Sequence, residues 1–184
     1  MSGRVKVSES VLLIFAVALL FDTTELTMIF ISSAFIHELG HLIAILLCKG
    51  KIISIKLTVF GGIINYHQQG GKINDIIICA SGAFFGLITA YISAKLGYFT
   101  FSGANLILSM VNMIPVLPLD GGRIAEQILP YKVVNILGFI MKLIITIAGI
   151  IIIIYGKGCS LLLFSCVLWG ATSKNSIEKH IKIR

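Results

Sequence analysis

The sequence predicts an α-helical integral membrane protein with about six transmembrane helices and a small β-hairpin or sheet at the cytoplasmic membrane face. Of its 184 residues, 57% are hydrophobic and only 12% are charged, whereas a soluble domain carries about 25% charged residues. The apolar residues form long runs, and about 20 apolar residues span a bilayer as a helix. A stretch between two of these runs alternates between apolar and polar residues, which is typical of a β-strand.

The apolar runs are separated by short polar stretches, and the chain is long enough for about six spans. The predicted helices cover about residues 10–22, 27–48, 73–96, 104–119, 134–155 and 161–171. The first follows a basic amino terminus and resembles a signal peptide, but no small-residue cleavage site follows it, so we expect a helix that is not cleaved. No soluble domain or internal repeat is visible, and we therefore expect residues 1–184 to form a single transmembrane domain.

Basic residues occur in alternate loops between the predicted helices. Arg4 and Lys6 precede the first helix, Lys49 and Lys51 follow the second, and further basic residues follow the fourth and the last. Cytoplasmic loops of membrane proteins are enriched in lysine and arginine. This pattern predicts a multi-pass protein of the cell membrane with both termini in the cytoplasm. The net charge of +7 has the same explanation, and we expect the lipid bilayer rather than nucleic acid around the chain.

The stretch from residue 51 to 67 differs in pattern from the apolar runs. Apolar and β-branched residues alternate with polar ones such as Ser54 and Lys56, Gly61 and Gly62 interrupt the alternation, and apolar residues then resume. A period of two predicts strands. We therefore expect a β-hairpin or small sheet at the cytoplasmic face, and a loop on the membrane surface is the alternative.

The motif His37-Glu38-Leu39-Gly40-His41 lies inside the second predicted helix. Residues four apart share one face of a helix, so both imidazoles can bind one metal ion, and Glu38 can reach a water molecule beside it. A charged residue at the bilayer centre costs about 2.5–3.5 kcal/mol on insertion scales, and a metal with enclosed water offsets such a cost. The alternative is a polar cluster that hydrogen-bonds to a neighbouring helix.

A third ligand is expected, because catalytic zinc usually takes three protein ligands and water. Asp120 is the best candidate, since it ends an apolar run and is followed by two glycines that allow close approach of the backbone. His67 and His180 fall in a predicted surface loop and in the tail, where they are poorly placed. The alternative for Asp120 is an ordinary helix N-cap for residues 121–129, of which 123–129 are predicted to form a short amphipathic helix.

Two motifs in this order resemble the site-2 protease family of intramembrane metalloproteases. They are His37–His41 and the later segment Asn112-Met113-Ile114-Pro115-Val116-Leu117-Pro118-Leu119-Asp120-Gly121. The resemblance covers about residues 30–130, although the second proline of the later motif is shifted. It implies that His37, His41 and Asp120 bind one Zn²⁺ per chain and that Glu38 is the catalytic base.

The same resemblance implies residues that bind substrate. Asn112 lies on the matched motif and is expected to hydrogen-bond the substrate backbone or the developing oxyanion. Phe60, Gly61 and Gly62 resemble the family's glycine-containing strand, whose edge would pair with an unwound substrate segment. Neither a PDZ nor a CBS domain fits in this chain. The compact arrangement of six predicted helices is most similar to the PDZ-less, sporulation-type subgroup (stage IV sporulation protein FB-like), without its CBS domain.

The function implied by the resemblance is that of a zinc endopeptidase acting in or near the transmembrane segment of a membrane-associated substrate. The subgroup suggests a transcription-factor precursor as substrate, cut in regulated intramembrane proteolysis, and an inhibitory membrane protein as a second partner. The alternative is a metal-ion transporter or metal-binding membrane protein, which would need the ligands but not Glu38. A structural membrane subunit without catalysis is a third reading, and such a protein would purify without zinc.

Overall fold

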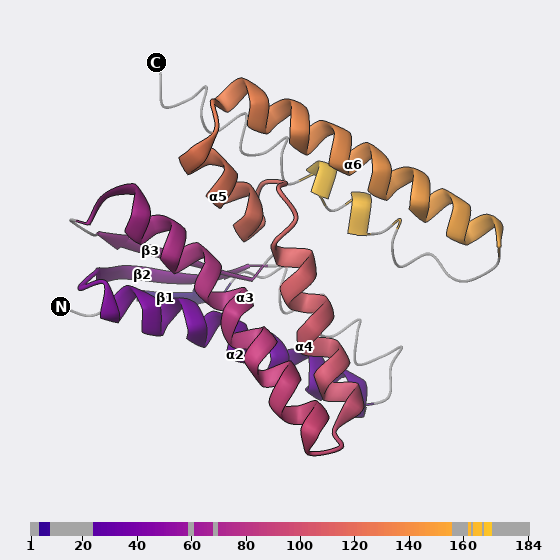
Figure 1. Cartoon of the computed structure of the whole chain (residues 1–184), viewed down its shortest axis with the longest axis horizontal. Coiled ribbons are helices and arrows are strands. Elements are labelled where there is room, and N and C mark those ends of the chain that lie inside the picture. The colour runs from indigo at the N-terminus through magenta and orange to yellow at the C-terminus, as the bar shows by residue number, and fades with distance from the viewer. Residues whose placement is uncertain are drawn as a thin grey trace. The chain divides into compact units, whose positions relative to one another are not determined.

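The computed structural model describes residues 4–7, 24–58, 61–67, 70–155, 162, 164–166 and 168–170. The helix predicted at 10–22 lies outside these residues. The chain divides into two compact units, Met1–Met113 and Ile114–Arg184. Figure 1 labels the helices and strands of both. The single transmembrane domain stays a prediction.

The described residues of the first unit include three helices. They are α2 (Thr24–Leu47), α3 (Gly71–Lys95) and α4 (Phe99–Asn112). The helices predicted at 27–48 and 73–96 are confirmed, with ends that differ by at most three residues. The prediction of a span at 104–119 is wrong, because α4 begins earlier and ends at Asn112. Pro115 and Pro118 lack the backbone N–H that a continuing helix needs.

The end of α2 directs the chain into the sheet. Lys49 adopts a left-handed conformation with φ 56°. The Gly50 N–H donates to the Ile45 carbonyl at 2.8 Å, and the Lys49 N–H donates to the Leu46 carbonyl at 3.0 Å. These two bonds form a Schellman motif, which satisfies the last carbonyls of a helix. The first strand after α2 therefore starts at Lys51, two residues beyond the turn.

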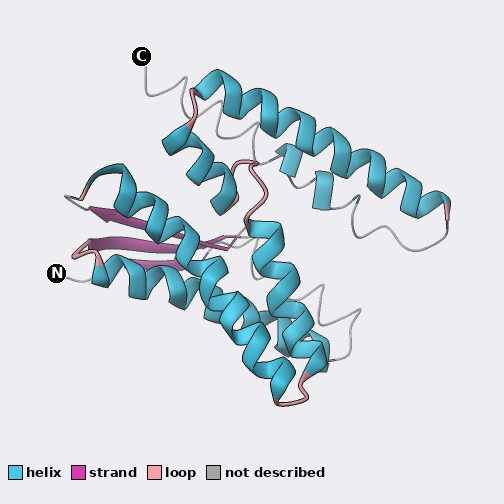
Figure 2. Ribbon diagram, in the orientation of Figure 1, coloured by secondary structure: helices cyan, strands magenta, loops and turns pink. Residues whose placement is uncertain are grey.

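A three-stranded sheet accompanies these helices (Figure 2). Its strands are β1 (Arg4–Val7), β2 (Lys51–Thr58) and β3 (Gly61–His67), in the order β1-β2-β3. The antiparallel pairing of β2 with β3 confirms the predicted hairpin. The parallel pairing of β1 with β2 was not predicted, although the alternation Arg4-Val5-Lys6-Val7 is a short strand signal.

A small apolar core joins the sheet to the ends of two helices. Ala44 and Ile45 of α2 and Ile78 of α3 are buried there, with Ile64 and Tyr66 of β3 packed against them. The Tyr66 hydroxyl donates to Asp75 Oδ1 near the start of α3 at 2.9 Å. The hairpin therefore packs against the C-terminal end of α2 and the N-terminal part of α3.

The second unit contains α5 (Asp120–Ile128), α6 (Tyr131–Ile154) and short helical pieces among the described residues of 162–170. The amphipathic helix predicted at 123–129 is confirmed but starts earlier. The segment predicted at 134–155 is confirmed as α6, which starts directly after Pro130. The core of this unit consists of Val116, Leu119, Ile145 and Leu168.

Among the described residues, three helices are long and apolar enough to cross a membrane. They are Glu25–Leu47, Gly71–Lys95 and Tyr131–Ile154. Large apolar side chains such as Phe35, Phe84 and Ile136 are more than half exposed on them. Exposed apolar surface of this extent marks a contact with lipid or with another protein. These helices support a location in the membrane, and the expected total of six spans stays a prediction.

Candidate metal centre

His37 and His41 lie on one face of α2 and are both buried, with 4% and 8% of their surfaces exposed. Their rings meet edge to face at an interplanar angle of 86°, and their Nε2 atoms are 3.2 Å apart. Two nitrogens that share one tetrahedral zinc, each about 2.0–2.1 Å from it, are about 3.3 Å apart. The pair therefore fits a shared metal ion.

The orientation of His41 is set by α3. Its Nδ1 lies 2.7 Å from the carbonyl oxygen of Ile78, which also accepts the Ser81 hydroxyl at 2.6 Å. A carbonyl can only accept, so Nδ1 carries the hydrogen of His41 in this arrangement. The lone pair of Nε2 then faces His37, and a histidine that donates its other N–H to a carbonyl is a common arrangement at metal sites.

Two glycines bring α3 close enough to make this contact. A Cβ atom added to Gly82 would clash with His41 Nε2 and would lie 2.6 Å from His41 Cε1 and 2.8 Å from His37 Cε1. A Cβ atom on Gly40 would lie 2.8 Å from the Ser81 carbonyl oxygen. The space at Gly82 is thus filled by the two imidazoles. Neither Ile78 nor Gly82 was predicted from the sequence to be part of the site, although small residues in an apolar helix signal close packing.

Asp120 is the first residue of α5 and is buried, with 8% of its surface exposed. Leu119, not Asp120, occupies the N-cap position, so the N-cap alternative is wrong. The predicted close backbone approach is confirmed at Gly122, where an added Cβ would lie 2.5 Å from the Val116 carbonyl carbon and 2.6 Å from the Leu117 nitrogen. A carboxylate is also favoured at a helix N-terminus.

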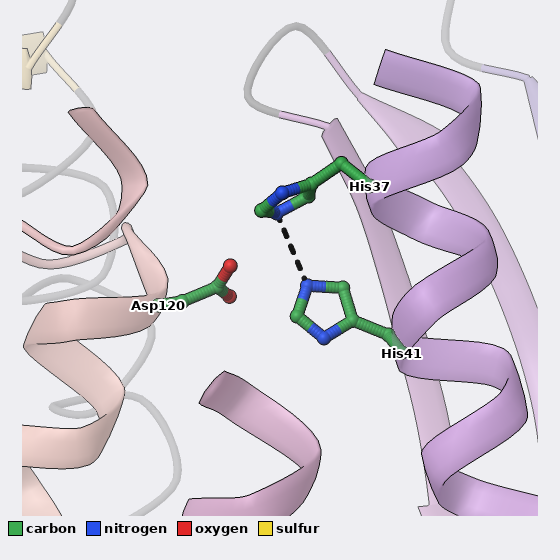
Figure 3. A group of neighbouring side chains, drawn as sticks. All are labelled: His37, His41 and Asp120. Carbon is green, nitrogen blue, oxygen red and sulfur yellow. Dashed lines mark hydrogen bonds between the residues drawn. The ribbon is translucent and has the colours of Figure 1, made fainter. Parts of the chain in front are cut away.

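His37, His41 and Asp120 could hold a metal ion (Figure 3). One ligand atom from each of the three side chains lies within 4.8 Å of the others. Two imidazole nitrogens and a carboxylate oxygen are ligands that zinc accepts, and three protein ligands leave a fourth position open.

The other predicted site residues lie on α2, on α4 and at the start of β3. Glu38 follows His37 on α2 and is half-buried. Asn112 is the last residue of α4, and its Nδ2 donates to the Leu108 carbonyl at 3.0 Å, which uses one of its two N–H groups. Gly61 and Gly62 begin β3, and Phe60 lies outside the described residues. The roles of these four stay predictions.

No family model and no curated protein matches this sequence. Among solved structures, the chain is similar to one described as the site-2 protease from Methanocaldococcus jannaschii. The two share 21% sequence identity with a TM-score of 0.69, over 95% of this chain and 91% of that chain. At this level of identity, the likeness shows a common fold. The common fold agrees with the predicted helical architecture with a small sheet.

Proposed function

We propose that this chain is an intramembrane zinc endopeptidase that hydrolyses a peptide bond in or near the transmembrane segment of a membrane-associated protein. The observation that carries the proposal is the pair of buried Nε2 atoms, 3.2 Å apart, on a helix long enough to cross a membrane. Polar groups within a membrane helix are costly, and one shared metal ion would offset the cost of burying both nitrogens.

His37, His41 and Asp120 would hold the zinc in this proposal. When bound, zinc supplies Lewis acidity that polarises a peptide carbonyl and makes a water molecule easier to deprotonate. Ile78 contributes through its carbonyl oxygen, which accepts the Nδ1–H of His41 and so leaves the Nε2 lone pair directed toward His37. The shared fold supports this assignment.

Glu38 would act as the general base and then as the general acid. It follows a proposed ligand directly on α2 and is half-buried, so its side chain is partly shielded from bulk water. We expect it to take a proton from the attacking water and to deliver it to the leaving amide nitrogen. Asn112, at the end of α4, would donate its remaining N–H to the substrate.

The depth of the site supports a membrane-embedded substrate. His41 lies six residues and His37 ten residues before the end of α2 at Leu47, which corresponds to about 9 and 15 Å along a helix. Lys49 and Lys51 follow that end, and basic loops face the cytoplasm. The proposal thus places the site below the cytoplasmic surface, with both termini in the cytoplasm.

The sheet offers a way to hold an unwound substrate. Among the described strands, β3 lies at an edge of the sheet, and an edge strand has backbone groups that can pair with an extended peptide. The substrate would lie along Phe60, Gly61 and Gly62. The motif resemblance favours a transcription-factor precursor as substrate, an inhibitory membrane protein as partner, and the sporulation-type subgroup.

The test compares Glu38→Gln with the wild type in purified, reconstituted protein. We expect Glu38→Gln to bind one zinc per chain but to leave candidate single-span substrates uncut, and a chelator to stop cleavage by the wild type until zinc is restored. Glu25→Gln, at an exposed position on the same helix, is the matched control and should cleave normally.

The same variant distinguishes the proposed protease from the alternative metal transporter. A transporter would need only the ligands, so zinc flux into vesicles would persist in Glu38→Gln. Cleavage by Glu38→Gln at the wild-type rate would eliminate the proposed mechanism, and purified wild type without zinc would eliminate the metal site.

A further inference from the structure

The segment between α2 and α3 is rich in lysine and lacks acidic residues. It carries four lysines from residue 49 to residue 74 and no aspartate or glutamate. Lys49 forms the turn after α2, Lys51 begins β2, and Lys72 lies in the first turn of α3. All three side chains are exposed, and none forms an ion pair within the part of the chain that the structure describes. We call these three lysines the basic rim.

The hairpin brings the basic rim together at one end of the first unit (Figure 1). In the antiparallel pairing of β2 with β3, Lys51 stands opposite His67. The hydroxyl of Tyr66, one residue before His67, donates to Asp75 near the start of α3 at 2.9 Å. The start of β2 and the end of β3 therefore lie beside the start of α3, and the turn at Lys49 joins them directly to α2.

The sheet turns one face to the helices and the other away from them. Ile64 and Tyr66 of β3 pack against the helix ends, so the residues that alternate with them belong to the opposite, outer face. Asn65 and His67 are exposed there, and so is Lys51 opposite His67. The outer face is thus polar and carries part of the basic rim.

The register adds further basic positions to this outer face. Asn65 pairs with Ser54, whose Oγ accepts the Asn65 Nδ2–H at 2.9 Å. Positions two apart on a strand share a face, so position Lys56 falls on the same face as Ser54. The parallel pairing of β1 with β2 then sets Arg4 opposite Ser54 and Lys6 opposite Lys56. Basic positions therefore continue along the outer face beyond the rim.

Large apolar side chains are exposed at the same end of the unit. Leu47 ends α2 and Ile73 lies in the first turn of α3, with 78% and 72% of their surfaces exposed. Ile53 is the extra residue of a β-bulge between Ile52 and Ser54 and is 61% exposed. Both helices are long and apolar enough to cross a membrane, and their adjoining ends mark one membrane surface. Lysines beside exposed apolar residues at this depth are typical of a contact with the lipid interface.

We propose that the basic rim binds the phosphate groups of anionic phospholipids at this membrane surface. The lysine ammonium groups would pair with the phosphates, whereas Leu47, Ile53 and Ile73 would contact the acyl chains beneath. A membrane matches both features, because anionic headgroups attract clustered lysines and the acyl region accepts apolar side chains. An acidic protein segment would match the charge but would leave the apolar residues in water. The proposal requires the membrane location and neither zinc nor cleavage.

The test measures the dissociation constant of phosphatidylglycerol for the purified full chain by native mass spectrometry from a neutral detergent, with phosphatidylcholine as the zwitterionic comparison. We expect the wild type to bind phosphatidylglycerol more tightly. Lys51→Gln should weaken that binding about fivefold, or by about 1 kcal/mol, which is the contribution of one lysine near an anionic surface. The triple variant Lys49→Gln/Lys51→Gln/Lys72→Gln should lose most of the preference for phosphatidylglycerol.

Two variants act as controls. Lys95→Gln removes an exposed lysine in the last turn of α3, about 35 Å along the helix from Lys72, and should bind phosphatidylglycerol as the wild type does. Replacement of all three rim lysines by arginine keeps the charge and should also preserve binding. Because the rim side chains are exposed, the glutamine triple variant should unfold at the wild-type temperature, so that its loss of binding is not a loss of the fold.

Two kinds of result would overturn the proposal. Unchanged phosphatidylglycerol binding in the glutamine triple variant, or a fivefold loss in Lys95→Gln as well, would show that the rim is not the site. A short polyglutamate peptide tests the other occupant. If the glutamine triple variant lost this peptide but kept the lipid, the rim would serve an acidic protein segment. Zinc content and cleavage do not enter these measurements, so the proposed protease is tested separately by Glu38→Gln.

Discussion

The substitution Gly82→Ala separates metal binding from folding at this site. A Cβ atom at residue 82 would meet the imidazoles of His37 and His41, with two of the nearest contacts at 2.8 and 2.6 Å. Ordinary contacts begin at 3.4 Å and His41 Cε1 lies at 2.6 Å, with Nε2 closer still, so the His41 ring must retreat by at least about 0.8 Å. The atoms displaced are the far ends of side chains, which move more easily than backbone does.

Metal affinity is expected to fall, whereas the stability of the metal-free protein is expected to change little. Metal–ligand distances are held to within about 0.2 Å, so a shift of this size leaves the imidazoles poorly placed. Perturbed support of a ligand costs about 10- to 100-fold in metal affinity, or about 1.4–2.7 kcal/mol. The metal-free protein gains from the helix preference of alanine over glycine, about 0.5–1 kcal/mol, which offsets the cost of moving the rings.

The assay is a competition titration of zinc against a chromophoric chelator, run beside thermal unfolding of the metal-free protein in detergent. Gly86→Ala is the matched control, because its Cβ would meet the Ser109 hydroxyl rather than a histidine. It should bind zinc normally. Gly40→Ala should lower the unfolding midpoint, because the Ser81 carbonyl oxygen at 2.8 Å belongs to the backbone of α3.

One result would refute this reasoning about the site. If Gly82→Ala bound zinc with wild-type affinity while Gly86→Ala did not, the imidazoles could not occupy the space beside α3. Loss of the folded state in Gly82→Ala would likewise show that the position serves helix packing rather than the ligands.

Two further substitutions test the parts that support the site. Gly122→Ala should lower the free energy of unfolding by about 1–3 kcal/mol, because the added Cβ would meet the backbone of Val116 and Leu117; an unchanged denaturation midpoint would contradict this. Tyr66→Phe removes the hydroxyl that donates to Asp75, a bond to a charged group with a net value of about 1.5–3 kcal/mol. Hydrogen exchange of the β2–β3 amides should then speed up, and unchanged exchange would show that the hairpin is held in another way.

Much of the site could be inferred from residue order because its main elements are local. The four-residue spacing of His37 and His41 places both on one helix face whatever surrounds them. The alternation at 51–67 depends only on the period of an extended chain. Asp120 stood out because an acid ends an apolar run before two glycines, and Gly122 indeed packs against backbone.

The remaining features depend on partners distant in the chain. β1 was missed because four residues carry too weak a pattern, and its identity as a strand comes from pairing with β2, some 50 residues later. The end of α4 was misplaced because apolar composition continues to Leu119, whereas the helix stops where prolines remove the backbone donors.

Composition and short-range periodicity thus decided the membrane setting, the two-histidine face of α2 and the hairpin, since each follows from neighbours within a few residues. Folding decided which backbone carbonyl orients His41, which glycine admits the two rings, and which amide on α4 pairs with Ser33. These depend on three helices meeting at particular heights, and helix crossings are set by the packing of side chains that no local pattern records.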